Sequence, residues 1–519
     1  MADHPSEHLT ERSTEYPTAP AAGHLNLARF CLGTRADDAT TADRPAFTFV
    51  LDDGERSWTY AQAWDRVQAI GRGLLTRGLE PGDRVLLRLP HSPEYAFAFF
   101  GATVAGLVPI PASPLLTEEE ADFFVQDATP RGIVTAPEMR LSAFEGIEVG
   151  IDELETLDGP GPLPETDAED AAFLIYTSGT TSKPKGVLHA HRSVYGRAMM
   201  REGWQDFRES DVTLHAGVLN WSYTLGVGLM DAWAAGAHAM LFGGTYEADQ
   251  WPALLERLGV TVFVAVPTVY RQILKYGHPE DRDLSNLRHG LVAAEPLSPE
   301  LRAEWQQRAG TEIYESLGMT EVSTYISSGP STPVRAGSPG RPQPGRRVAI
   351  LPEEGPPEPL PPGDVGLLAV HRSDPGLMLG YWQRPEEDAV VYRGEWFVGG
   401  DLASLDDDGY LWFHGRADDV MKSFGYRLSP VEIEAALISC EGVAEIAVVG
   451  LDIGDGKTLV TACIVVQPGA TLEASTLEAH AAQHLAEYKR PHQYRFLDSL
   501  PRAVTGKLQR SRLVEQLRA

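Results

Sequence analysis

The chain of 519 residues is poor in cysteine and in positive charge. Its three cysteines, Cys31, Cys440 and Cys463, lie far apart and form no CxxC pair. This argues against a disulfide framework or a zinc site and fits a reducing cytoplasm. Lysine and arginine total 44 against 73 aspartates and glutamates, so the net charge is −29. Nucleic acid and anionic membrane surfaces would repel such a chain, and neither is expected as a partner.

The sequence also has little that would direct it to a membrane. Residues 1–23 read as a polar N-terminal tail without the basic and apolar segments of a signal peptide. The best candidate for a membrane span is Tyr95–Ala112, which carries no charge but is broken by Gly101, Gly106, Pro109 and Pro111. We expect a buried helix followed by a strand there, and a cytoplasmic protein.

Apolar strand-like runs alternate with helical patterns through most of the first 400 residues. Thr59 and Gln62 form a capping-box start, Gly78 can end the helix that follows, and Val85–Leu89 reads as the next strand. Further strands of this kind are expected at Thr261–Val266 and His289–Ala293. The alternation is typical of α/β proteins with parallel sheets.

The pattern of expected helices and strands changes after Gly415. Ser429 and the proline after it predict a helix start, and a helix around Thr476–Glu487 is expected. Two strands are expected between them, at Ala444–Val449 and Leu459–Val466. We therefore expect a domain over residues 24–417 and a second one over 418–519. The proline-rich segment Glu353–Gly366 could be a linker, but a long turn between two strands is preferred because a strand pattern resumes at once.

The most informative stretch is residues 176–187, YTSGTTSKPKGV. An apolar run over residues 172–175 precedes it, which predicts a strand leading into a loop. Small hydroxyls, lysines and glycines make such a loop suited to holding phosphate through backbone amides and cations. Its order is not that of a P-loop, which needs GxxxxGK[ST]. Composition alone leaves an ordinary polar surface loop as the alternative.

Four further segments accompany this loop in a fixed order: YESLGMTE (314–321), GYWQRPE (380–386), residues 394–434 and LPRAVTGKLQR (500–510). Each alone has a plain structural explanation, such as a turn cap or a surface ion pair. Together they resemble the acyl-adenylate-forming superfamily of acyl-CoA synthetases, aryl-CoA ligases, adenylation domains and luciferases. The resemblance covers roughly residues 45–515. The spacing of YESLGMTE is closest to benzoate-type aryl-CoA ligases.

The resemblance implies a fold and a reaction. The α/β fold would have a large N-terminal domain of layered, mostly parallel sheets and helices. A small, mobile α+β C-terminal domain would carry the catalytic lysine. The enzyme would join a carboxylic acid to ATP with Mg²⁺, giving acyl-AMP and pyrophosphate. It would then pass the acyl group to coenzyme A. The sequence leaves the oligomeric state open, a homodimer included.

The resemblance also implies the site residues. Three would be catalytic: Lys507 bridging the carboxylate and the α-phosphate, Thr320 bonding that phosphate, and Glu321 as the hard oxygen ligand of magnesium. Asp401 would accept from the ribose hydroxyls. ATP and AMP would be bound by Thr177, Ser178, Gly179, Thr180, Thr181, Lys185, Ala294, Glu295, Pro296, Glu315, Ser316, Leu317, Gly318, Thr320, Asp401, Arg416 and Lys507. The domain hinge and the thiol tunnel would lie at Asp418, Lys422 and Gly425.

Three residues depart from the family pattern without removing a charged group. Ser182 and Ala294 stand where glycine is usual, and Gly399 stands where threonine is usual. The acid pocket would be lined by Asn220, Trp221, Tyr223, Ala293 and Gly318. The two aromatic side chains could form a flat wall, which favours an aryl or arylacrylic acid, although either could be a core residue.

The acceptor and the class of protein have alternatives. No carrier domain is fused to the chain, which favours coenzyme A over a free-standing carrier protein. Activation of nitrite for diazotisation of an aromatic amine is a third option. A nucleotide-binding regulator with a dead site is disfavoured, because Glu321, Asp401, Arg416 and Lys507 are all present.

Overall fold

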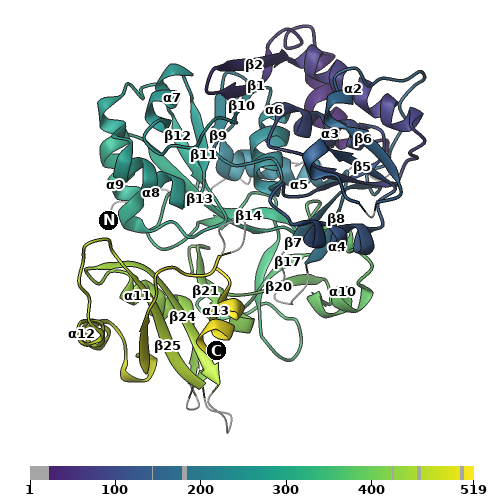
Figure 1. The fold of residues 1–519 in the computed structure, drawn as a ribbon. Coiled ribbons are helices and arrows are strands. Elements are labelled where there is room, and N and C mark those ends of the chain that lie inside the picture. Colours follow the sequence, from purple (N-terminus) through teal and green to yellow (C-terminus); the bar gives the residue numbers. More distant parts are fainter. Residues whose placement is uncertain are drawn as a thin grey trace, which may run out of the picture.

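A nine-stranded sheet forms the centre of the larger part of the molecule in this computed structural model (Figure 1). The model describes residues 23–142, 144–177, 184–419, 421–423, 426–452, 458–502 and 508–518. The strand order is β15 (Arg341–Pro342), β14 (Ser323–Ser327), β13 (Glu312–Met319), β12 (His289–Val292), β11 (Val262–Ala265), β9 (Val212–His215), β10 (His238–Phe242), β1 (Pro45–Leu51) and β2 (Gly54–Thr59). The strands from β13 to β1 run parallel, and antiparallel strands close both edges. The parallel strands predicted at 261–266 and 289–293 are confirmed as β11 and β12.

A second, wholly parallel sheet has the order β4 (Val108–Pro111), β3 (Arg84–Arg88), β5 (Gly132–Thr135) and β6 (Ile147–Gly150). Helix α2 (Tyr60–Thr76) begins with the predicted capping box of Thr59 and Gln62, and Gly78 follows its end with a φ of +98°. The uncharged run from Tyr95 falls on the buried helix α3 (Pro93–Val104) and on β4, as expected. Helices α2 and α3 belong to the largest hydrophobic cluster, which joins the two sheets.

The remaining helices of this part connect the strands and cover the sheets (Figure 1). They are η1 (Arg29–Gly33), α1 (Thr34–Ala36), α4 (Glu118–Ala128), η2 (Pro137–Met139), η3 (Ile151–Glu153), α5 (Ser193–Met200), η4 (Arg201–Gln205), η5 (Thr224–Asp231), α6 (Ala232–Ala235), α7 (Trp251–Arg257), α8 (Pro267–Tyr276), η6 (Pro279–Asp281), α9 (Pro299–Ala309) and α10 (Pro385–Val391). Among the described residues, none of the helices has the length and apolar character that crossing a bilayer requires.

Antiparallel strands complete the larger part. One small sheet has the order β18 (Gly380–Tyr381), β8 (Lys185–Ala190) and β7 (Ala171–Thr177). Another has the order β16 (Val348–Leu351), β17 (Gly366–His371), β20 (Trp396–Leu405) and β19 (Tyr392–Arg393), with β21 (Leu411–Arg416) also paired to β20. Strands β16 and β17 pair directly, with Leu351 opposite Leu367. The segment Glu353–Gly366 is therefore a long turn within one sheet, as preferred from the sequence.

The C-terminal part has its own sheet and its own hydrophobic cluster. Its elements are η7 (Ala417–Asp419), β22 (Met421–Ser423), β23 (Tyr426–Leu428), α11 (Pro430–Leu437), β24 (Val443–Asp452), β25 (Thr458–Val466), α12 (Ala474–His484), η8 (Glu487–Lys489), β26 (Gln493–Phe496) and α13 (Arg510–Arg518). Ser429 caps α11 by accepting from the amide of Glu432 at 3.4 Å, as predicted. The helix expected to reach Glu487 ends at His484 instead, because Leu485 turns extended and buries its side chain.

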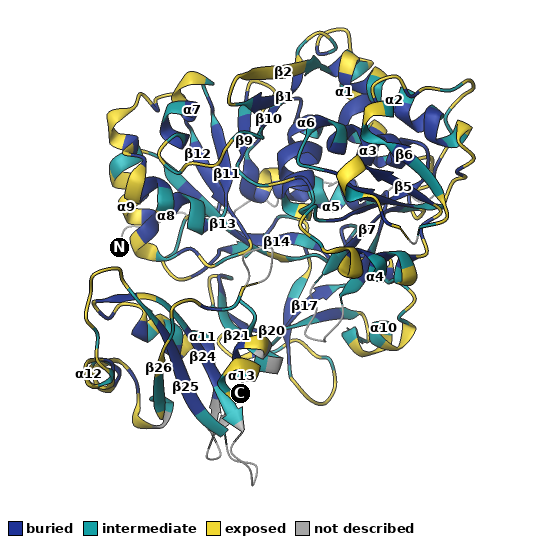
Figure 2. Ribbon diagram, viewed as in Figure 1, coloured by how far each residue is buried: buried dark blue, intermediate teal, exposed yellow. Residues whose placement is uncertain are grey.

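The fold class expected from the motifs is confirmed: a large α/β part with mostly parallel sheets precedes a smaller α+β part. Buried strands and helices fill the interior of both parts (Figure 2). The polar tail (residues 1–22), Ser178, Gly179, Thr180, Thr181, Ser182, Gly425 and Lys507 lie outside the described residues.

Candidate functional site

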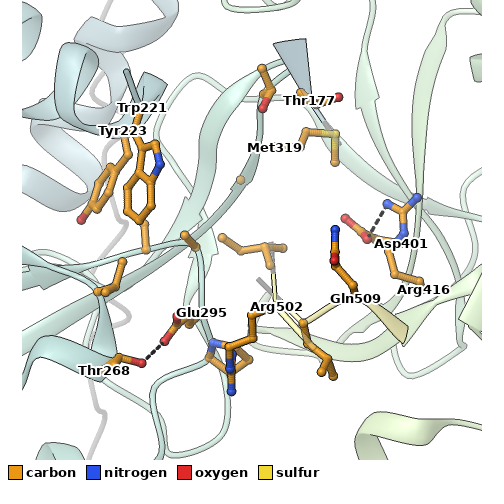
Figure 3. A pocket seen from close by; sticks show the side chains of 18 of the residues that line it. Thr177, Trp221, Tyr223, Thr268, Glu295, Met319, Asp401, Arg416, Arg502 and Gln509 are labelled. Carbon is orange, nitrogen blue, oxygen red and sulfur yellow. Dashed lines mark hydrogen bonds and ion pairs between the residues drawn. The ribbon is translucent and has the colours of Figure 1, made fainter. Parts of the chain in front are cut away.

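A deep cleft of about 3410 Å³ lies between the larger part and the C-terminal part. Figure 3 shows side chains from both parts pointing into it. It brings together side chains that are far apart in sequence, such as Asn220 and Gln509, which are 289 positions apart. The predicted site residues that line it are Thr177, Asn220, Trp221, Tyr223, Ala293, Ala294, Glu295, Pro296, Glu315, Ser316, Leu317, Gly318, Thr320, Glu321, Asp401 and Arg416.

The two ends of the predicted phosphate loop lie at this cleft. Thr177, the last residue of β7, and Pro184, just before β8, both line it. The two strands pair with Thr177 opposite Lys185, so a hairpin holds the loop ends together. Lys185 itself is not among the described residues that line the cleft. Its ammonium group forms an ion pair with Glu387 of α10 and lies 5.5 Å from the ring centroid of Tyr381.

Strand β13 runs along the cleft and carries Glu315. A carboxylate oxygen of Glu315 accepts from the amide of Leu297 at 3.0 Å, and Arg302 of α9 lies 3.8 Å from the other oxygen. Burial outweighs both interactions and raises the pKa of Glu315 to about 7. Burial therefore favours the neutral form of this carboxyl group, whose carbonyl oxygen can still accept a hydrogen bond.

The loop after β12 follows the same wall. Ala294 has a φ of +74°, in the left-handed region that favours glycine. This is the position where the sequence departs from the usual glycine, so the backbone shape is kept and the alanine is strained. Glu295 is fixed by the hydroxyl of Thr268, which donates to its carboxylate at 2.8 Å.

Glu321 lies just beyond the end of β13 and is held by a tyrosine. The hydroxyl of Tyr381 donates to one Glu321 oxygen at 2.8 Å. The neighbouring residue, Thr320, is held through its carbonyl, which accepts from Nε2 of His189 at 2.8 Å. His189 is buried, which lowers its pKa to about 4, so the ring is neutral and carries its proton on Nε2. The carboxylate and the threonine are therefore positioned from two different strands.

Asp401 and Arg416 face each other across β20 and β21. Their side chains form an ion pair of 3.1 Å, and the guanidinium group also donates to the carbonyl of Gly399 at 2.6 Å (Figure 3). Gly399 is the second departure from the family pattern. A Cβ at this position would lie 2.5 Å from Cε of Met319, so Met319 occupies the space that a threonine would need.

The predicted aromatic wall is present on the cleft. Trp221 and Tyr223 lie side by side at one end of it (Figure 3). Tyr223 also contacts the core, since its ring stacks on Trp204 at 6.3 Å and meets the edge of His215 at 4.7 Å. The tyrosine therefore belongs to both the pocket wall and the core, as the alternative interpretation had allowed.

The C-terminal part closes the cleft from the opposite side. Arg502, Leu508 and Gln509 line it, and Figure 3 shows Arg502 and Gln509 on this side. Arg502 and Leu508 also pair as an antiparallel bridge. These residues stand directly on either side of residues 503–507, so both borders of the segment that contains Lys507 lie at the cleft. Of the predicted hinge and tunnel residues, the structure describes only the backbone of Asp418 in η7 and of Lys422 in β22.

Several residues that hold the site together carried no prediction. Tyr381, which holds Glu321, lies within GYWQRPE, and that motif was the only sequence signal for it. His189 and Arg197 line the cleft, yet neither stands in a quoted motif. Their roles depend on contacts with Thr320 and Ser323, more than 120 positions away, which no local pattern reveals.

Known proteins resemble this chain over almost its whole length. The family model described as AMP-binding enzyme matches residues 34–382, and the model of the AMP-binding enzyme C-terminal domain matches residues 432–507. A benzoate–CoA ligase of Thauera aromatica is 34% identical over 503 residues, covering 91% of this chain and 93% of that enzyme. A 3-hydroxybenzoate–CoA ligase of Aromatoleum sp. (strain CIB) is 30% identical, with 97% and 99% covered.

A solved structure agrees with these matches. The anthranilate CoA ligase AuaEII, in complex with anthranoyl-AMP, superposes with a TM-score of 0.85 at 28% identity, covering 95% of this chain and 97% of that one. The resemblance inferred from the motifs is confirmed. The chain belongs to the family of AMP-binding enzymes.

Proposed function

We propose that this protein activates an aromatic carboxylic acid with ATP, giving an acyl-AMP and pyrophosphate, and then transfers the acyl group to coenzyme A. The observation that supports this best is the divided cleft. Glu321 and Asp401 line one side, and the borders of the Lys507 segment lie on the other. The enzyme class, an AMP-forming acid–thiol ligase, is confirmed by the family and by the ligases that match over more than 90% of the chain.

The proposed first step is an in-line displacement at the α-phosphate. A carboxylate oxygen of the acid bonds to phosphorus as the bond to pyrophosphate breaks, so two anions must be aligned and partly neutralised. We assign Thr177 and the loop after it to the β- and γ-phosphates, and Lys507 to the carboxylate and the α-phosphate. Lysine suits this position because it is a compact charge on a long stem.

The nucleoside is assigned to the opposite walls of the same cleft. Asp401 is placed to accept from the ribose hydroxyls, with Arg416 holding it in position at 3.1 Å. Glu315 is placed to accept from the adenine amino group, and Ala294 with its neighbours would lie against the ring. Lys185, held by Glu387, fits a supporting position behind the phosphate loop better than a direct phosphate contact.

The carboxylate of Glu321, just beyond the end of β13, fits a magnesium ligand. Among the described residues, no three acidic, histidine or cysteine side chains stand together as a metal cage. Magnesium is commonly held by one or two carboxylates together with the substrate phosphates, so a single carboxylate is sufficient. Glu321 would hold the ion through the oxygen that Tyr381 leaves open, and the ion would neutralise phosphate charge.

The second step needs a different arrangement of the C-terminal part. The thiol of coenzyme A attacks the acyl carbon, and AMP leaves with the electron pair of the broken bond. We place the domain boundary at residue 418, with Asp418 as the hinge and Gly425 at the thiol tunnel. A glycine there would let the pantetheine arm pass close to the backbone.

A screen of carboxylic acids for ATP-dependent pyrophosphate release tests the function. The panel contains aryl, arylacrylic and medium-length aliphatic acids together with nitrite, each with and without coenzyme A. We expect release with aryl acids and, when coenzyme A is present, aryl-CoA in the mass spectrum. Asp401→Ala and Asp364→Ala form a matched pair, because Asp401 lines the cleft, whereas Asp364 is exposed and does not line it. Release with nitrite alone, or acyl-AMP that never reaches coenzyme A, would contradict the proposal.

A further inference from the structure

Two buried hydroxyl groups line the cleft without a hydrogen-bond partner among the described residues. They belong to Ser316 on β13 and Thr324 on β14, which are 4% and 8% exposed. An unpaired buried hydroxyl costs roughly 1–3 kcal/mol, and such groups are rare in folded proteins. Two of them on neighbouring strands at a binding cleft therefore point to a partner that arrives with the substrate.

The sheet geometry places both hydroxyls on one face. Gly318 pairs directly with Thr324 at a β-bulge, where the register skips Tyr325, and Ser316 stands two positions before Gly318 on the same strand. Residues two apart on a strand, and residues paired across two strands, share a face. A Cβ at Gly318 would lie 2.5 Å from Cα of Thr324 and 2.3 Å from the carbonyl oxygen of Ser323. Only glycine permits this close approach, so Gly318 brings the backbone of β14 against β13 next to the two hydroxyls.

This face is not the one that carries the adenine-side carboxylate. Glu315 and Ser316 are adjacent on β13, so their side chains point to opposite faces of the strand. Glu315 points toward Leu297 and α9. Ser316 was grouped with the ATP-binding residues on the basis of resemblance, but its position on the strand fits the acid side of the cleft.

A neutralised ion pair borders the same wall. Arg197 of α5 forms a two-pronged pair with Asp231 of η5, with both nitrogen–oxygen distances at 2.7 Å, and Gln205 donates to the same carboxylate at 2.6 Å. The guanidinium group also donates to Ser323 at 3.0 Å and so holds a serine whose φ of +76° is strained. Asp231 compensates the charge of Arg197. The pair therefore has no net charge to attract a carboxylate of the substrate, and this wall suits a neutral group.

We propose that the acid carries a neutral hydrogen-bonding ring substituent, a hydroxyl or an amino group, and that Ser316 and Thr324 bind it. This inference rests on the proposed function and adds the substrate class. The two hydroxyls can each donate or accept, so they match a substituent that does both. They are specificity-determining residues, with Gly318 allowing the close approach of β13 and β14 and Arg197 holding the β14 side of the wall.

Acids that differ only in one ring substituent test the proposal. Benzoates with a hydroxyl, amino or methyl group at each ring position are compared by kcat/KM for pyrophosphate release. A methyl group fills similar space but leaves the buried hydroxyls unpaired. We expect the preferred hydroxy or amino acid to exceed its methyl counterpart by about tenfold to a hundredfold in the native enzyme.

Variants then assign the preference to the two side chains. Thr324→Val, which keeps the shape, and Ser316→Ala should each bring the ratio of the two kcat/KM values toward one. Thr103→Val is the matched control, because that buried threonine donates to Phe99 at 2.9 Å within α3 and does not line the cleft. Melting curves verify that each variant is folded.

The outcomes separate the two proposals. Aryl acids that are adenylated with no preference for hydroxyl or amino over methyl would overturn this inference and leave the function in place. A preference that survives in both variants would overturn the assignment to Ser316 and Thr324. If no aryl acid supports pyrophosphate release, the proposed function fails first and this inference fails with it.

Discussion

Replacing Glu315 with glutamine should stabilise the protein relative to the native chain. This gain in the free energy of unfolding should be larger at alkaline pH than at acid pH. The folded protein raises the pKa of this carboxyl group from its ordinary value of 4.5 to about 7, because the group is buried. Between these two values the folded state keeps a proton that the unfolded chain has lost. Native stability therefore falls as the pH rises through this window. A glutamine carries no charge and can still accept from the amide of Leu297.

The magnitude follows from the two pKa values. The advantage of the glutamine variant should be about 1 kcal/mol at pH 5 and about 3 kcal/mol at pH 8, since each pKa unit corresponds to about 1.4 kcal/mol. The change of about 2 kcal/mol between these pH values corresponds to roughly 2 °C in Tm for a cooperative unit of about 400 residues.

Melting curves of both proteins at four pH values from 5 to 8 test this expectation. Glu300→Gln is the control, because that glutamate is exposed on α9. A Tm difference between Glu315→Gln and the native chain that stays constant across the range would refute the buried, proton-binding carboxyl. The same variant should still bind ATP, because an amide oxygen can accept from the adenine amino group.

Three further variants test the cleft. Lys507→Ala should lower acyl-AMP formation by about a hundredfold or more, yet still allow thioester formation from supplied acyl-AMP; an equal loss in both assays would contradict two arrangements of the C-terminal part. Glu321→Ala should abolish the magnesium dependence of pyrophosphate release, and an unchanged magnesium titration would remove its role as ligand. Ala294→Gly should raise stability by up to about 1 kcal/mol by relieving the left-handed φ, and a lower Tm would show that the alanine is not strained.

Local patterns predicted those elements whose ends are set by local contacts. The capping box at Thr59 and the cap at Ser429 need only residues three positions away, and both appear as expected. The end of α12 was predicted too late because Leu485 leaves the helix to bury its side chain. Burial against distant elements is not visible in a helical pattern.

At the candidate site, too, the sequence predicted local features but not contacts between distant segments. Most of the predicted site residues that the structure describes do line the cleft. The motifs did not predict that Lys185 pairs with Glu387 or that Tyr381 holds Glu321, because both partners come from distant segments. Thr324 stands outside every quoted motif, and only the strand register brings it to the acid side.

The change of partners along β13 separates two kinds of recognition. Its first half pairs with β12 beside the residues assigned to adenine, and its second half pairs with β14 beside the residues assigned to the acid. Substitutions on β14 can therefore alter which acid is accepted while the nucleotide contacts stay intact. An enzyme built in this way can acquire a new substrate through one antiparallel strand, without having to evolve its use of ATP again.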